Sequence, residues 1–140
     1  MDNSNWYGLG IAALTLLFIF FVKTPEKNSE VESLQQTTMA IHDEAMRELA
    51  GMNRVGRMLK SALAEIDSVS ARADSIRLVI RQMQKAEDDM YAWMRTYKAP
   101  DKLPAEEAKV YLEGQKEAIS ANNRDIQAAL AAGNRLLEKI

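Results

Sequence analysis

The sequence predicts an all-α protein with an N-terminal single transmembrane helix followed by an antiparallel three-helix bundle. Residues 6–22 (WYGLGIAALTLLFIFFV) form one uncharged apolar run at the start of the chain. After Lys23 the apolar residues recur at spacings of three, four or seven, as on one face of a helix. No alternating pattern of the kind that indicates a strand is present in the sequence.

Composition limits the domain count and several classes of function. The chain has 140 residues, so that about 115 remain for one small domain after the apolar run. The net charge of −2 shows no basic excess, and we expect no nucleic-acid partner. The absence of cysteine excludes disulfides, thiolate metal sites and the acylated cysteine of a lipoprotein.

Residues 1–23 are predicted to be a membrane anchor, with the membrane contact at residues 6–22. At 1.5 Å per residue this segment is roughly 25 Å long, just enough for a hydrocarbon core of about 30 Å. Trp6 and Lys23 suit the two membrane interfaces, and the sequence lacks the positive n-region and cleavage site of a secretory signal. An uncleaved, single-pass signal anchor is therefore expected. Lys23 and Lys27 follow the segment, which by the positive-inside tendency favours a cytoplasmic bundle.

Residues 24–28 are predicted to be a linker, because Pro25 ends the anchor helix, and the first bundle helix is predicted over residues 29–66. Ser29 and Glu32 have the spacing of a capping box. A coiled-coil-like stripe follows, and Gly51 and Gly56 within it are expected to permit close approach of another helix. The stripe consists of Ile41, Ala45, Met52, Val55, Leu59, Ala62, Ile66 and Val69.

Two further helices are predicted over residues 74–97 and 104–139. The serine- and aspartate-rich segment 66–74 allows either a turn or a continued helix, but an unbroken helix to Tyr97 would be roughly 100 Å long, which favours a turn. Pro100 and Pro104 mark the next break. The expected inner face of the third helix is Ala108, Tyr111, Leu112, Gln115, Ala118, Ile119, Ile126, Ala129, Leu130, Gly133, Leu137 and Ile140, with Asn122 at a core-like position.

One set of side chains offers a possible metal site. Met39, His42 and Met46 are spaced three and four residues apart, so they share one helix face. Met90 and Met94 would approach that face in an antiparallel pair. An imidazole with thioethers suits Cu(I). The alternative interpretation is that these methionines fill gaps in the core and His42 lies at its rim.

No catalytic constellation is present, and the protein is not expected to be an enzyme. His42, Asp43 and Glu44 are consecutive on a helix and diverge by about 100 degrees each, so they do not converge on one substrate atom. No phosphate-binding loop, nucleophile elbow or zinc signature occurs in the sequence. Trp93 and Tyr111 are expected to close one end of the bundle by packing.

Three segments resemble a group of small bacterial envelope proteins labelled viral A-type inclusion protein. They are MAIHDEAM, AEDDMYAWMRTYKAP and AKVYLEGQKEAISANNRDI. The resemblance covers about residues 39–137 and implies an extracytoplasmic helical bundle of no established activity. Members of this group resemble lipoproteins, whereas this chain carries an apolar helix in place of the lipidated cysteine.

These observations favour a membrane-tethered accessory or scaffold protein of the bacterial envelope that acts by protein–protein contact. The alanine-rich last helix predicts a protein partner or self-association through helical faces. The alternative function is soft-metal (copper) binding or handling through the Met/His face.

Overall fold

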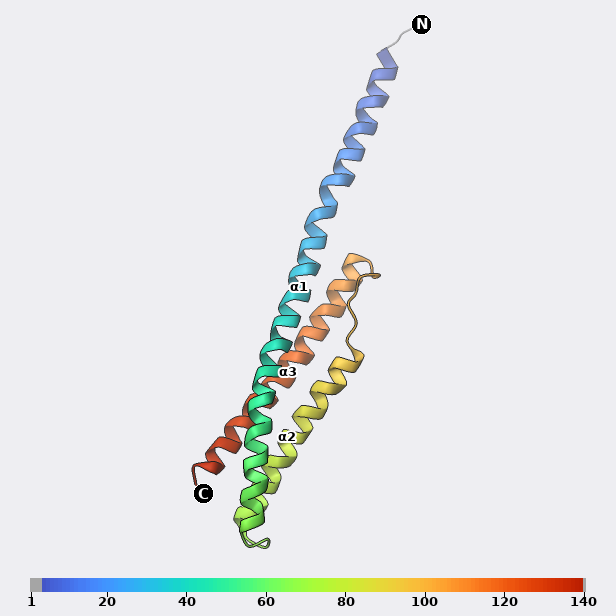
Figure 1. Ribbon diagram of the computed structural model, residues 1–140. Helices are drawn as coiled ribbons and strands as arrows, with labels where there is room; N and C mark the ends of the chain where they lie inside the picture. Colours follow the sequence, from blue (N-terminus) through green and yellow to red (C-terminus); the bar gives the residue numbers. More distant parts are fainter. Residues whose placement is uncertain (1–3, 140) are drawn as a thin grey trace.

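The computed structural model describes the backbone of residues 4–139 and the side chains of residues 29–139. Over this range the chain forms three helices, α1 (Ser4–Glu65), α2 (Ala71–Thr96) and α3 (Ala105–Leu137), and no strand. α2 runs antiparallel to both α1 and α3, and α1 extends well past the other two helices at its N-terminal end (Figure 1). The predicted all-α fold with three helices is confirmed.

α1 differs from its prediction because it does not break at residues 24–28. The helix continues from Ser4 to Glu65, whereas the sequence analysis places a linker there and begins a new helix at residue 29. A proline inside a helix removes one hydrogen bond and crowds the preceding turn, at a cost of about 3 kcal/mol, but its φ is compatible with the helix, so the backbone can continue through it. The anchor region and the first bundle helix therefore share one backbone helix.

Where side chains are described, no helix combines the length and the apolar character needed to cross a membrane. The predicted anchor at residues 6–22 lies outside that part of the chain. The transmembrane assignment thus gains no support from the structure and stays a prediction.

The predicted turn between the first two helices is confirmed. Ser70 caps α2 by accepting a hydrogen bond from the Ala73 amide at 3.2 Å, and its hydroxyl donates to the Asp67 carbonyl at 2.7 Å. This cap starts α2 at Ala71, three residues before the predicted start. Val69, predicted to be the last residue of the apolar stripe, is 85% exposed, because α1 has already ended at Glu65.

The two-proline segment forms the second break, as predicted. α3 begins at Ala105 after Pro104, with Glu106 and Glu107 in its first turn, where carboxylates stabilise the positive end of the helix dipole. The loop is tied to α3 by the backbone amide of Lys98, which donates to the Tyr111 hydroxyl at 3.0 Å.

The core lies along the axis between the three helices and consists mainly of aliphatic and methionine side chains. Asn122 is buried there, as its core-like position predicted, and its amide nitrogen donates to the Ala86 carbonyl of α2 at 2.9 Å. Ala118 is exposed, contrary to prediction. The fully buried large side chains are Met52, Leu59, Ile76, Met90, Leu112, Ile119 and Ile126, together with Thr38.

Among the described glycines, Gly133 of α3 leaves the least room for a side chain. A Cβ atom there would lie 2.4 Å from Met83 Cε and 2.6 Å from Val55 Cγ1. Gly51 and Gly56, the glycines predicted to permit close helix approach, leave more room. A Cβ at Gly51 would lie 3.8 Å from Leu130, and a Cβ at Gly56 would lie 3.5 Å from Met83. Gly133 therefore allows α1, α2 and α3 to meet at one level.

Candidate functional site

Among the predicted ligand residues of α1, His42 contacts α2. The His42 ring stacks on the Trp93 ring with centroids 5.5 Å apart, and the Asn53 amide donates to the Glu87 carboxylate at 2.9 Å. These two contacts fix the antiparallel register of α1 against α2. Met46 lies between His42 and Asn53 on α1 and is therefore level with the part of α2 between Glu87 and Trp93.

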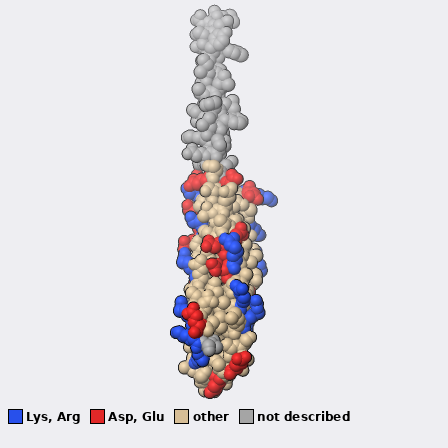
Figure 2. Space-filling model, turned by 60° about the vertical axis from the view of Figure 1, so that its left-hand side comes forward, with Lys and Arg blue, Asp and Glu red and all other residues tan. Residues whose placement is uncertain are grey.

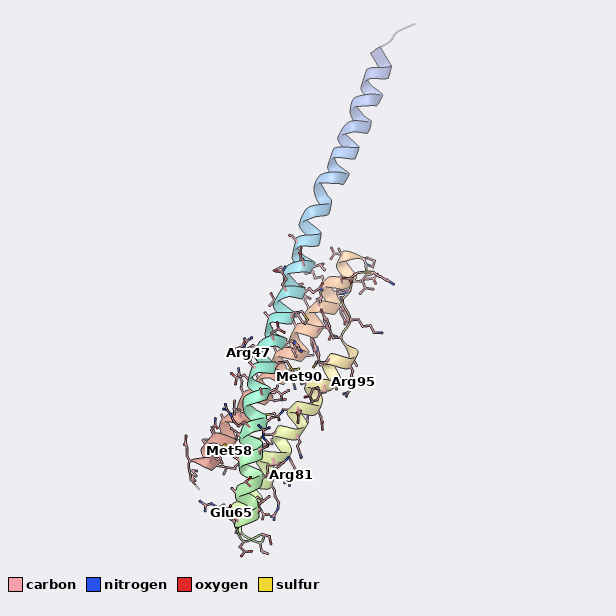
Figure 3. The ribbon with its side chains drawn as sticks, in the orientation of Figure 1. Arg47, Met58, Glu65, Arg81, Met90 and Arg95 are labelled. Atoms are coloured by element: carbon pink, nitrogen blue, oxygen red, sulfur yellow. The ribbon has the colours of Figure 1, made fainter. Side chains whose placement is uncertain are left out.

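The methionines at this level differ in accessibility. Met90 is fully buried, on the part of α2 that faces the other helices (Figure 3), whereas Met94 is 42% exposed. Met39 and Met46 are half-buried against the core. Met90 thus fills the core, as the alternative interpretation proposed, whereas the other three are partly or largely accessible to solvent.

His42 is oriented by its neighbour in the chain. Its Nδ1 lies 3.0 Å from a carboxylate oxygen of Asp43, and its side chain is 14% exposed. When Nδ1 carries the proton and donates to this carboxylate, Nε2 keeps the lone pair that binds metals. No group of three or more His, Cys, Asp or Glu side chains suited to a metal ion occurs in the described part of the chain.

An aromatic stack connects all three helices at the end of the bundle nearest the α2–α3 loop. Trp93 stacks on Tyr97 at 4.7 Å, and Tyr97 lies 6.4 Å from Tyr111 of α3. Burial raises the pKa of the Tyr97 hydroxyl, and Tyr111 and Asp101 raise it further. The stack confirms the predicted packing role of Trp93 and Tyr111.

The second surface of interest is an alanine-lined groove between α2 and α3, with a volume of about 480 Å³. Its alanines are Ala86, Ala128, Ala129 and Ala132, and its polar residues are Gln82, Lys85, Asp89, Asp125 and Arg135. The hydrogen bond between the Lys85 ammonium and the Asp89 carboxylate raises the pKa of Lys85. Because α2 and α3 are antiparallel, both aspartates lie toward one end of the groove and Arg135 toward the other.

Sequence reasoning missed the partner of Glu87. Glu87 is a charged residue on the otherwise apolar inner face of α2. Its carboxylate accepts a hydrogen bond from the Asn53 amide of α1. The only signal for this contact in the sequence is a polar residue at an inward-facing position of each helix, as at Asn122.

Comparison with protein-family models, with curated proteins and with solved structures finds no match to this chain.

Proposed function

We propose that the protein is a membrane-tethered accessory or scaffold protein of the bacterial envelope that acts by protein–protein contact. The groove between α2 and α3 carries this proposal. Its alanine side chains are small enough to let a partner helix approach the two backbones closely. Because Asp89 is paired with Lys85, the charges of Asp125 at one end and Arg135 at the other would fix the direction of that helix.

The tether is the uncharged run at residues 6–22, with the bundle on the extracytoplasmic side. The resemblance to envelope proteins supports that side, against the two lysines that follow the run. Resistance of the full chain to alkaline extraction from membranes tests the tether. Protease digestion of sealed vesicles then tests the side, and cleavage of the bundle in inside-out vesicles alone would reverse the proposed orientation.

The groove is tested by crosslinking from a photoreactive residue at Gln82 in the full chain in its native membrane. Ala128→Arg fills the groove, whereas Ala131→Arg changes an exposed alanine of α3 that does not line it. We expect a crosslinked protein that is lost with Ala128→Arg and retained with Ala131→Arg. Repeated recovery of the uncrosslinked protein alone, or equal crosslinking in both variants, would contradict contact through this groove.

A second candidate function is binding of Cu(I) at the α1–α2 face, with Met39, His42 and Met46 as ligands and Met94 at its edge. The Asp43 contact, which leaves the His42 Nε2 lone pair available, favours it. The buried position of Met90 makes that residue a packing side chain in this proposal.

Titration of the full chain with Cu(I) against a competing chelator tests this second candidate. His42→Ala and Met46→Ala should each weaken binding at least tenfold, whereas Met58→Ala, a half-exposed methionine elsewhere on α1, should leave it unchanged. Equal affinity in all three variants would remove the site.

A further inference from the structure

The loop between α2 and α3 lies at the same end of the bundle as the N-terminal extension of α1. The ion pair between the Lys109 ammonium and the Glu30 carboxylate, at 2.6 Å, ties the first turns of α3 to α1 just below this extension. Figure 1 shows the loop beside α1, and the α1–α2 turn at the opposite end. The loop therefore lies close to the base of this extension.

The loop is locally basic in an acidic protein. The loop between Thr96 and Ala105 carries two cations, Lys98 and Lys102, and one carboxylate, Asp101, so its net charge is +1, whereas the whole chain has −2. Lys98 and Lys102 are exposed, and neither ammonium is among the ion pairs of residues 29–139. Elsewhere charges of both signs are interspersed over the bundle surface, as Figure 2 shows for one face.

Both lysines line a shallow hollow in the loop with a volume of about 560 Å³. Asp101, Thr96 and Tyr111 line it as well, so its charged groups are two ammonium groups and one carboxylate. Leu103, which is 42% exposed, forms part of its apolar wall. Ammonium groups beside hydroxyl groups and an apolar wall match a phosphate headgroup attached to a lipid chain.

The length of α1 sets the distance from this loop to a membrane. Pro100 and Leu103 line a second hollow together with Val31, so the loop is level with the residues around 30 of α1. From residue 22 to residue 30 a helix rises about 12 Å. The headgroup layer extends about 5 to 7 Å beyond the hydrocarbon core. Extended lysine side chains, or a helix tilt of about 20° toward the loop, bridge the remaining distance.

We propose that the α2–α3 loop binds anionic phospholipid headgroups through Lys98 and Lys102 and so holds the bundle against the membrane surface. This inference rests on the proposed tether at residues 6–22. Surface lysines near an anionic bilayer each add an attraction that falls off within a Debye length, so the contact weakens with salt. The loop thus provides a second attachment that depends on lipid charge.

The test uses the full chain in nanodiscs of phosphatidylcholine, with or without phosphatidylglycerol. Because the chain contains no cysteine, Leu103→Cys accepts a single fluorophore at the loop, and Val69→Cys places the same fluorophore at the opposite end of the bundle. Quenching by lipids that carry a spin label on the headgroup reports how close each site comes to the surface. At residue 103 we expect at least twofold more quenching with the anionic lipid, and at residue 69 no change.

Charge variants identify the residues responsible. Lys98→Gln with Lys102→Gln should abolish the lipid-dependent increase, whereas Lys60→Gln, an exposed lysine of α1 far from the loop, should preserve it. Equal quenching in both lipids, or an increase that survives the double substitution, would overturn the inference while leaving the tether intact. If inorganic phosphate changed the fluorescence at residue 103 by the same amount in nanodiscs without anionic lipid, the hollow would be assigned to a free anion. That result would also overturn the inference. A chain that fails to enter the nanodisc would refute the tether and this inference with it.

Discussion

Replacing Gly133 by alanine tests the tight helix contact at this glycine. The new Cβ would lie 2.6 Å from Val55 Cγ1 and 2.4 Å from Met83 Cε. The Met83 methyl group is the end of a flexible side chain and can rotate away. Val55 is β-branched and stiff at χ1, so the helices themselves have to separate.

Two opposing effects determine the magnitude. Alanine improves on glycine inside a helix by about 0.8–1.0 kcal/mol, and overpacking of a well-packed core costs about 1–3 kcal/mol. We therefore expect Gly133→Ala to lower the free energy of unfolding by about 1 kcal/mol. Gly114→Ala is the matched control in the same helix, because no atom lies within 4 Å of its added Cβ. The control should gain about 0.8 kcal/mol from helix propensity alone.

The assay is urea unfolding of the full chain in detergent, followed by circular dichroism at 222 nm. The two variants should shift the midpoint in opposite directions, with a difference of about 2 kcal/mol between them. If Gly133→Ala were as stable as Gly114→Ala, the three helices would not meet at Gly133 and the reasoning would be refuted.

Three further substitutions give expected outcomes in the same unfolding assay. Ser70→Ala removes the hydrogen bond to the Ala73 amide and should cost about 1 kcal/mol, whereas Ser68→Ala in the same turn should cost little; equal effects would argue against the cap. Trp93→Ala removes the centre of the aromatic stack and should cost about 3–5 kcal/mol; a loss below 1 kcal/mol would show that the ring is not packed. The pKa of Tyr97 is raised in the folded state, so folding favours its protonated form. The stability that this gives the fold is fully present below pH 10 and is lost as the pH rises through the folded pKa. Tyr97→Phe should flatten stability against pH above 10 and, because the buried hydroxyl has no hydrogen-bond partner, should cost nothing at pH 7; an unchanged pH profile would assign the effect to another group.

The fold follows from the sequence wherever local signals are strong. Helical spacing, the serine-rich turn and the pair of prolines suffice to predict three helices, and their order predicts an antiparallel arrangement of neighbours. Even the polar core position of Asn122 was evident. These features depend on a few adjacent residues, which a single sequence displays.

The close contacts could not be predicted because they depend on how helices face each other. Gly51 and Gly133 look alike in sequence, and only the packing around Val55 and Met83 distinguishes them. Likewise, Pro25 predicts a break that the continuous α1 does not have. For the candidate metal face, helical spacing predicts that Met39, His42 and Met46 share one face, but the burial of Met90 depends on all three helices together.

The unbroken α1 also has a mechanical consequence. One helix belongs both to the N-terminal extension and to the bundle, so the two behave as a single lever with its pivot at the base of the extension. From residue 29 to residue 65 the helix is about 54 Å long. A rotation of about 20° at the pivot, the usual tilt of a membrane helix, would sweep the α1–α2 turn through about 18 Å. In the proposed membrane-tethered protein, a change of lipid thickness that altered this tilt would displace the far tip laterally by a similar distance.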